Sequence, residues 1–311
     1  MNSILDDFKM AFRSGNILNQ IIVINVVVFL AILILEVVVG FFLQQKELLD
    51  TITSYLEFTP VPGDLLFQPW SILTYGFVHY GIFHILFNML FLYWFGKIIT
   101  GMLGQNKVLG LYVWGVISGA LLYFILYNLF PNVALLGGPR PEMIGASAGV
   151  YAVMVGAAVF QPNMTFNLIL LGPVKIKYIA AFYIVLSLAG VNGGNSGGNI
   201  AHLGGAFMGY LFISQMYKGN DWSKPVVSFI HWFKSFFKPQ PKIKVSYKNE
   251  EKFGSKTKRK SSGSRKTKTK AKSAETSSQA EIDAILDKIS EKGYDALSKE
   301  EKQKLFNASK Q

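Results

Sequence analysis

Two kinds of residue are scarce in this sequence, and each scarcity excludes a class of protein. There is no cysteine, so neither a disulfide nor a thiolate metal site can form. Charged residues make up 16% of the chain and hydrophobic residues 50%, whereas a soluble globular domain has about 25% charged residues. This composition, with long apolar runs, is typical of a protein that crosses a membrane several times.

Six apolar runs are expected to form membrane helices. The sequence therefore predicts an all-α polytopic membrane protein, with a bundle of six transmembrane helices within residues 21–217. The fourth run stops at Gln161-Pro162 and is too short to cross the hydrocarbon region alone. It should begin below the membrane surface, where only surrounding protein or a water-filled cavity can satisfy its free N–H groups. The six runs are residues 21–42, 81–99, 108–130, 147–160, 178–188 and 200–217.

The other segments differ from these runs in composition. We expect residues 1–20 to be a cytosolic lead, 218–237 an interfacial amphipathic segment, 238–278 a disordered basic linker and 279–311 a small helical hairpin. Residues 234–272 hold fifteen Lys and Arg against two Glu, which accounts for the net charge of +12. By the positive-inside rule both termini are expected in the cytoplasm, with the basic tail contacting anionic lipid rather than nucleic acid.

Three connecting stretches complete the predicted membrane domain. Residues 44–77 are polar and then aromatic, as expected of an interfacial segment on the outer surface. Residues 164–171 are expected as a re-entrant or interfacial piece. The Gly- and Asn-rich stretch 190–199 lies just before His202, so it is expected to move and to cap a cavity there.

Ser147 and His202 are the candidate nucleophile and base. A serine hydroxyl is a weak nucleophile until a base takes its proton, and histidine is the usual base because its pKa is near neutral. Tyr151 follows Ser147 by one helical turn and could stack on the imidazole. Small residues would let the fourth and sixth helices approach closely enough to join the pair: Gly149, Ala152 and Gly156 on the fourth, and Ala201, Gly205 and Gly209 on the sixth.

His84 and Asn88 are the candidate donors for a developing oxyanion. They are four residues apart and therefore share one face of the second helix. The backbone N–H of Ser147, at a helix start, is a third donor. The sixth run contains no acid that could orient His202, so the arrangement is predicted to be a dyad rather than a triad.

Each of these signals has a plainer interpretation. The run Gly145-Ala146-Ser147-Ala148-Gly149 occurs by chance in Gly-rich chains, and no strand precedes it as an α/β-hydrolase would require. A lone intramembrane histidine is more often a packing residue or a proton relay than a general base. His79 is either an interface residue or part of the site, and His231 is expected on the surface without a role. The combination of one Ser, two His and one Asn on three helices favours a catalytic site.

That combination resembles the rhomboid family of intramembrane serine proteases. The resemblance is carried by Trp70 and by the blocks 79–89, 145–151 and 201–205 with Gly209, and it covers roughly residues 20–217. It implies a six-helix bundle with a water-filled cavity and no cofactor or metal. It also implies a serine endopeptidase of the bacterial plasma (inner) membrane that cuts single-span membrane proteins within or near their transmembrane helix.

The resemblance also implies a role for each matching residue. Ser147 would be the nucleophile and His202 the base. His84, Asn88 and the Ser147 amide would line the oxyanion hole, and the supporting residues would be Tyr151, His79 and Gly145.

The sequence departs from the family at three places. Ser71 stands where an Arg often follows the loop tryptophan, Thr100 where a Glu is frequent, and Ala148 where a Gly is frequent. These differences concern loop anchoring and helix packing rather than the dyad.

Two other functions stay open beside the protease. One is a catalytically inactive relative that binds client membrane helices, although such proteins typically lack the serine or the histidine. The other is a transporter or channel, which the absence of inverted repeats and the scarcity of buried charge disfavour.

Overall fold

The computed structural model describes residues 16–130, 132–133, 141–168, 172–236, 282–289 and 296–308. The chain divides into two compact units, Met1–Pro241 and Lys242–Gln311. The predicted basic linker, residues 238–278, and most of the predicted N-terminal lead lie outside the described residues.

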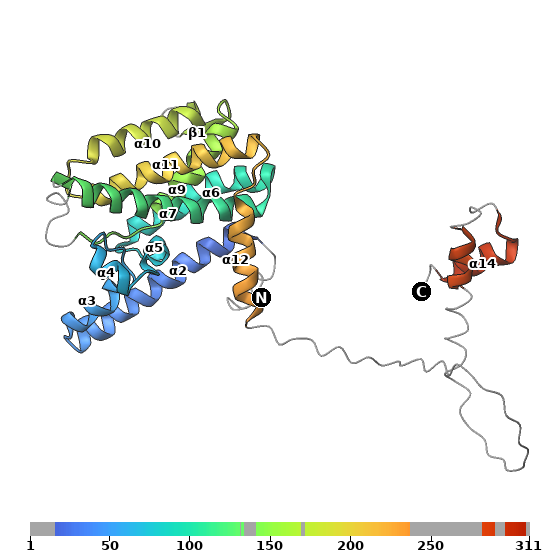
Figure 1. Cartoon of the computed structure of the whole chain (residues 1–311), viewed down its shortest axis with the longest axis horizontal. Coiled ribbons are helices and arrows are strands. Elements are labelled where there is room, and N and C mark those ends of the chain that lie inside the picture. The colour runs from blue at the N-terminus through green and yellow to red at the C-terminus, as the bar shows by residue number, and fades with distance from the viewer. Residues whose placement is uncertain are drawn as a thin grey trace, which may run out of the picture. The chain divides into compact units, whose positions relative to one another are not determined.

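The first unit is a helical bundle, shown in Figure 1. Among its described residues, six helices have 14 or more residues, and each coincides with one of the six predicted runs. The helices in chain order are α2 (Ile17–Leu35), the π-helix η1 (Glu36–Phe42), α3 (Lys46–Ser54), α4 (Pro62–Phe67), α5 (Ser71–Thr74), the 3₁₀ helix η2 (Tyr75–Phe77), α6 (Ile82–Leu103), α7 (Gln105–Leu129), α9 (Ser147–Phe160), α10 (Ile176–Gly190), α11 (Ser196–Tyr217) and α12 (Ser223–Ser235).

The central helix of the bundle is α9. Every residue from Ala148 to Ala158 is buried, and α6, α7, α10 and α11 surround it (Figure 1). Its small side chains permit this close packing. The helix ends at Gln161 because Pro162 disfavours helical backbone in the residue before it and cannot continue the hydrogen-bond ladder.

Backbones touch where α9 meets α11. A Cβ on Gly205 would lie 2.0 Å from the carbonyl oxygen of Ala148, and a Cβ on Gly209 would lie 2.3 Å from that of Ala152. The prediction that Gly205 and Gly209 permit a close approach is therefore confirmed.

The predicted partner face on α9 was partly wrong. Gly149 packs against Tyr112 of α7, whereas a Cβ on Gly156 would meet both Leu111 of α7, at 3.0 Å, and Ile213 of α11, at 3.5 Å. Residues 149 and 156 are seven positions apart, about two helical turns, so they share one face of α9. That face lies about 100° around the helix from the face of Ala148. Gly115 and Gly119 of α7 pack against the Cβ atoms of the two α9 alanines that also meet α11.

Two connections contain secondary structure that the sequence analysis did not predict, and their expected interfacial location stays a prediction. The stretch 44–77 is built of short helices, and it is fastened by Trp70 Nε1, which donates to Tyr55 O at 2.7 Å, and by Thr74 Oγ1, which donates to Leu56 O at 2.9 Å. The piece expected to be re-entrant or interfacial is part of an antiparallel hairpin of β1 (Thr165–Leu168) and β2 (Gly172–Lys175). Phe166 and Val174 pair across it, and Phe166 packs on Phe95 of α6, which helps to hold the hairpin on the bundle.

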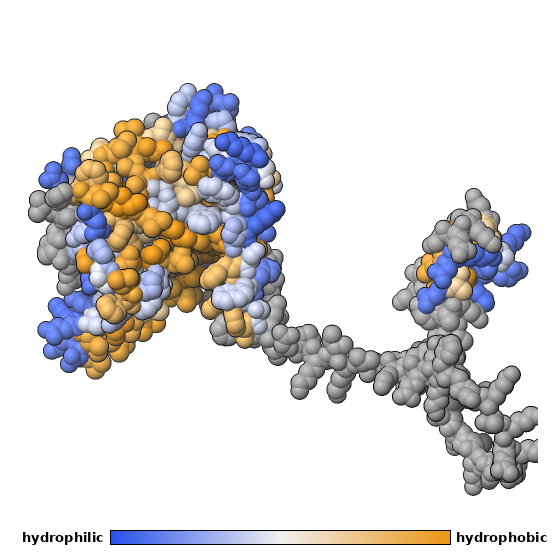
Figure 2. Space-filling model, viewed as in Figure 1, coloured by the Kyte–Doolittle hydropathy of each residue, from blue (hydrophilic) through white to orange (hydrophobic). Residues whose placement is uncertain are grey.

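The surface of the first unit fits a membrane protein. Three helical stretches are long and apolar enough to cross a membrane, namely Ile17–Phe42, Ile82–Leu103 and Gln105–Leu129, and Ser147–Phe160 and Ile176–Gly190 are shorter apolar helices. Figure 2 shows hydrophobic surface across the middle of the unit and hydrophilic residues toward its ends. The chain therefore forms an all-α membrane bundle with one small hairpin, and the number of six spans stays a prediction.

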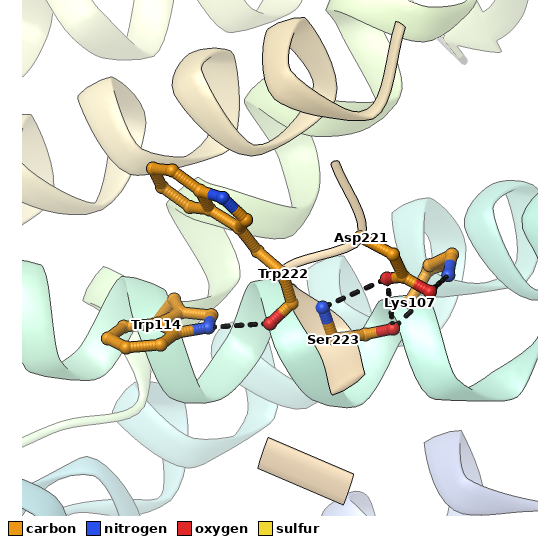
Figure 3. A network of polar contacts seen from close by, with 5 residues as sticks. All are labelled: Lys107, Trp114, Asp221, Trp222 and Ser223. Carbon is orange, nitrogen blue, oxygen red and sulfur yellow. Dashed lines mark hydrogen bonds and ion pairs between the residues drawn. The ribbon is translucent and has the colours of Figure 1, made fainter. Parts of the chain in front are cut away.

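A polar clamp fastens α12 to α7 (Figure 3). Lys107 Nζ lies 2.5 Å from Asp221 Oδ2, and Asp221 Oδ1 accepts from both the backbone N–H and the hydroxyl of Ser223, at 3.0 and 2.6 Å. Trp114 Nε1 donates to Trp222 O at 2.8 Å. Asp221 thus accepts from the first N–H of α12 while its charge is paired with Lys107 at the start of α7.

The second unit contains two described helical pieces, residues 282–289 and α14 (Lys299–Ala308). A capping box begins α14: Ser298 Oγ accepts from Glu301 N–H at 3.2 Å, and Glu301 Oε2 accepts from Ser298 N–H at 2.7 Å. Ile285 and Leu297 are buried, and Lys288 bonds to Glu301 at 2.9 Å. The contact between Lys288 and Glu301 joins the two helical pieces, and the small helical hairpin stays a prediction because residues 290–295 between them lie outside the described residues.

Gly205→Ala should lower the free energy of unfolding by about 2 kcal/mol, because the new methyl group must push the backbones of α9 and α11 apart. Gly101→Ala is the matched control, since a Cβ there meets nothing within 4 Å. It should be neutral or slightly stabilising because alanine is the better helix former. Thermal unfolding in detergent measures both, and equal stability of the two variants would contradict the close contact.

Asp221→Asn should loosen α12, as measured by amide hydrogen exchange over Ser223–Ser235. Partial burial raises the pKa of Asp221, but the hydrogen bonds from Lys107 and Ser223 outweigh it and hold this pKa below its usual value. The stabilisation is therefore present above the unfolded pKa of about 3.9 and is lost as the pH falls through the lower folded value.

At pH 7 the amide hydrogens of α12 should exchange more slowly in the wild type than in Asp221→Asn. This difference in exchange rate should vanish when both proteins are compared at a pH below the pKa of Asp221 in the folded state. Asp64→Asn, on α4, is the control and should leave exchange in α12 unchanged. A difference between wild type and Asp221→Asn that persists in acid would contradict the clamp.

Candidate active site

Ser147 and His202 are brought into direct contact. Ser147 is the first residue of α9, and His202 lies in the second turn of α11. The distance between Ser147 Oγ and His202 Nε2 is 2.7 Å. The close packing of α9 on α11 at Gly205, one turn beyond His202, sets this distance.

Tyr151 lies flat against the imidazole of His202. The two ring centroids are 4.3 Å apart and the rings are inclined by 12°. The Tyr151 hydroxyl reaches across to α10, where it lies 2.9 Å from Ser187 Oγ and 3.3 Å from Tyr183 O. The predicted stacking on His202 is present in the structure, and the Tyr151 hydroxyl links this ring to α10.

Ser187 is a site residue that the sequence analysis missed. Its Oγ lies 3.2 Å from His202 Nδ1, and its side chain is buried. A lone serine in an apolar helix most often bonds to the carbonyl four residues earlier on its own helix. Nothing in the sequence near residue 187 therefore distinguishes it from such a serine.

A cavity of about 680 Å³ opens onto these groups. His84 and Asn88 of α6 line it together with Ser147, Tyr151, Ser187 and His202. One N–H of the Asn88 amide donates to His84 O at 2.9 Å, so the second is left to serve a ligand in the cavity. The first N–H groups of α9 have no acceptor within the helix. The structure thus assembles side-chain and backbone donors around the serine.

Gly145 and His79 lie outside the described lining of the cavity but contact the residues that form the site. Gly145 has φ +114°, and its N–H donates to Tyr75 O at 3.0 Å. A Cβ at this position would lie 2.8 Å from His84 Nε2, so glycine is needed both for the backbone conformation and for space.

His79 is fully buried, and its Nε2 accepts from the N–H of Ala146 at 3.3 Å. Its ring centroid is 4.9 Å from that of His84. His79 is not among the described residues that line the cavity, so its contact with the site is indirect. His231 is exposed on α12, as expected from the sequence.

The loop expected to cap the cavity is shorter than predicted. Helix α11 begins at Ser196, so only residues 191–195 connect α10 to α11. Asn195, Gly198 and Asn199 do line the cavity, and Asn199 Nδ2 donates to Gly190 O at 2.9 Å. The stretch is adjacent to the cavity, and its movement stays a prediction.

Comparison with known proteins identifies this domain. A model of the rhomboid domain matches residues 66–218, which include all the site residues named above. The chain belongs to the rhomboid family. A second model, for a family of unknown function, matches residues 269–311, which include the helical pieces of the second unit.

Several curated rhomboid proteins are similar to this rhomboid. RHOMBOID-like protein 12, mitochondrial, of Arabidopsis thaliana is 30% identical over 48% of this chain and 47% of its own length. Presenilin-associated rhomboid-like protein A, mitochondrial, of Danio rerio is 28% identical over 53% of this chain and 43% of its own. Rhomboid protease GlpG of Klebsiella pneumoniae is 28% identical over 39% and 40%. The chain thus spans less than half the length of these relatives.

The three departures from the family motif fit the bundle of this rhomboid. Ser71 is buried without a hydrogen bond at its Oγ, and the loop is held by Trp70 and Thr74 instead. Thr100 donates to Lys97 O on its own helix at 3.2 Å. Ala148 occupies the space left by Gly119, where a Cβ would lie 2.6 Å from the alanine methyl group.

Gly145→Ala should destabilise this rhomboid by more than the cost of placing an alanine at a positive φ. A positive φ costs an L-residue about 1–2 kcal/mol, and the new methyl group must also displace His84. Gly104→Ala is the matched control, because Gly104 has φ +90° but open space around a Cβ. Both variants should lose similar backbone stability in thermal unfolding.

Gly145→Ala should lose further stability beyond that amount, and it should react more slowly with a serine-directed fluorophosphonate. Equal stability and equal labelling of the two variants would show that His84 does not depend on Gly145.

Proposed function

We propose that this rhomboid is an intramembrane serine endopeptidase that cleaves single-span membrane proteins within or near their transmembrane helix. The observation that carries the proposal is the 2.7 Å contact between Ser147 Oγ and His202 Nε2 at the wall of a cavity. A serine with a base at this distance can be activated as a nucleophile.

The arrangement accounts for each proton in peptide hydrolysis. His202 Nε2 takes the proton of Ser147 as Oγ bonds to the scissile carbonyl carbon, which produces a tetrahedral oxyanion. His202 then gives that proton to the leaving amine nitrogen as the C–N bond breaks. A water molecule then attacks the acyl-enzyme while His202 Nε2 takes one of its protons, and His202 gives that proton to Ser147 Oγ as the Oγ–C bond breaks and the carboxylic acid leaves.

The oxyanion is met by the donors of α6 and α9. Asn88, His84 and the free N–H at the start of α9 surround Ser147 in the cavity. Removing one such donor from a soluble serine protease lowers kcat by about 10²- to 10³-fold. The positive end of the α9 dipole favours the developing charge as well.

The walls of the cavity suit an apolar substrate. Phe83, Phe87 and Phe91 of α6 and Leu186 of α10 line it beside the polar groups. Phe83, Phe87 and Leu186 are also exposed on the outside of the bundle, so a membrane helix could pass from lipid to Ser147 along apolar side chains. This supports a membrane-spanning substrate rather than a soluble peptide.

Charge at the two ends of the bundle supports a location and an orientation. The site end, at α3, carries acidic residues such as Glu47 and Asp50, whereas Lys107, Lys218 and Lys224 lie at the α12 end. By the positive-inside rule the α12 end faces the cytoplasm. We propose a multi-pass protein of the bacterial plasma membrane with both termini cytoplasmic, whose basic tail at residues 234–272 contacts anionic lipid.

The alternative is a rhomboid-like protein that binds client membrane helices without cutting them. It uses the same apolar walls but leaves Ser147 unreactive. Chemical reactivity of the serine therefore separates the two functions without knowledge of the natural substrate.

In detergent, wild type should be labelled by a fluorophosphonate, and Ser147→Ala and His202→Ala should lose labelling and cleavage of a model single-span substrate, by at least about 10³-fold. Ser214→Ala and His231→Ala are matched controls, because Ser214 Oγ donates to Tyr210 O on its own helix and His231 is exposed on α12. Folded but unlabelled wild type, or cleavage that survives in Ser147→Ala, would overturn the proposed function.

A further inference from the structure

We propose that Ser187 of α10 is a positioning residue for His202, which it holds in the tautomer that leaves Nε2 free to act as a base. The inference rests on the proposed function. It adds to the site a residue that lies outside the sequence motifs described above. It also extends the predicted dyad to a series of four hydrogen-bonded side chains with one direction: Ser147, His202, Ser187 and Tyr151.

The contacts of Ser187 are not those of an ordinary serine in a membrane helix. Such a serine donates to the carbonyl four residues earlier, which here is Tyr183 O. Instead, Ser187 Oγ lies 3.2 Å from His202 Nδ1 and 2.9 Å from the Tyr151 hydroxyl, and Tyr183 O is contacted by Tyr151 at 3.3 Å. Only 1% of the Ser187 side chain is exposed, so its hydroxyl has to find its partners within the protein.

The direction of each hydrogen bond follows from the far end of this chain. A backbone carbonyl only accepts, so the Tyr151 hydroxyl donates its single proton to Tyr183 O. The Tyr151 oxygen must then accept from Ser187, which spends the single proton of the serine. Ser187 Oγ can therefore only accept from His202, so the proton of the neutral imidazole lies on Nδ1.

This assignment decides what Nε2 can do. With the proton on Nδ1, Nε2 carries a lone pair that faces Ser147 Oγ at 2.7 Å and can take its proton. While His202 holds that proton it is an imidazolium, and its Nδ1–H still donates to Ser187 through a charge-assisted hydrogen bond. The same proton then leaves from Nε2 to the amine, and the Nδ1 proton never moves. Ser187 thus serves the orienting function that a carboxylate serves in a triad.

Ser187→Ala tests the positioning role with the full chain in detergent. For a model single-span substrate, kcat should fall about tenfold, which corresponds to about 1.4 kcal/mol, whereas KM and the unfolding temperature should stay within twofold and about 2 °C of wild type. Ser187→Thr keeps the hydroxyl and should restore most of kcat. Ser71→Ala is the matched control, because Ser71 is also buried but its Oγ has no hydrogen-bond partner. A kcat in Ser187→Ala equal to that of Ser71→Ala would overturn the inference.

A double-mutant cycle with Tyr151→Phe tests the assigned direction of the chain. Phenylalanine keeps the ring on His202 but removes the group that accepts from Ser187. Both changes interrupt the same series of hydrogen bonds. The fold-loss of kcat in the double variant should therefore be smaller than the product of the fold-losses in the two single variants. A loss equal to that product would contradict the proposed series of hydrogen bonds.

The two levels of proposal fail separately. Wild type that no fluorophosphonate labels removes the proposed function and this inference with it. Labelled wild type with an unimpaired Ser187→Ala removes the positioning role alone.

Discussion

The close approach of α9 to α11 is the contact on which the site depends. A hydrogen bond of 2.7 Å between Ser147 and His202 is possible only if the two helices are held at one separation. The two residues are 55 positions apart in the sequence, so this separation is set by tertiary packing. The backbone contacts of Gly205 and Gly209 fix the separation of the two helices because no side chain lies between them. In lipid, where the hydrophobic effect contributes little between helices, such packing is the main source of precision.

The polar groups at the wall of the cavity satisfy one another through hydrogen bonds within the protein. Ser147, His202, Ser187 and Tyr151 form one hydrogen-bonded series that ends on a backbone carbonyl of α10. In an apolar medium each of these bonds is stronger than in water, and each unpaired member would be costly. The requirement to satisfy every donor therefore does more than stabilise the series: it gives the series a single direction and the imidazole a single tautomer.

The sequence predicted the parts of the site that local patterns encode. Ser147 at a helix start, Tyr151 one turn later, and His202 beside a stripe of small residues all follow from spacing, and the structure places them together. Ser187 did not follow, because its partners are set by how α10 leans on α9 and α11, and its own neighbours in sequence are merely apolar. The same reason explains the wrong partner face on α9, where Ala148 and not Gly149 meets α11. The hairpin of β1 and β2 was not predicted because four residues per strand are too few for their alternation to stand out in the sequence.

The helices around His202 thus have separable tasks. Helix α9 carries Ser147, the proposed nucleophile, and the Tyr151 ring that stacks on the imidazole, so its packing on α11 sets the distance from Ser147 to Nε2. Helix α10, through Ser187 and Tyr183, sets which nitrogen holds the proton in the proposed arrangement. Contact between a serine and a histidine is therefore only part of what the proposed base needs for its full activity in this bundle. The base also requires α10 to be in place, and reactivity is linked to the assembly of three helices rather than two.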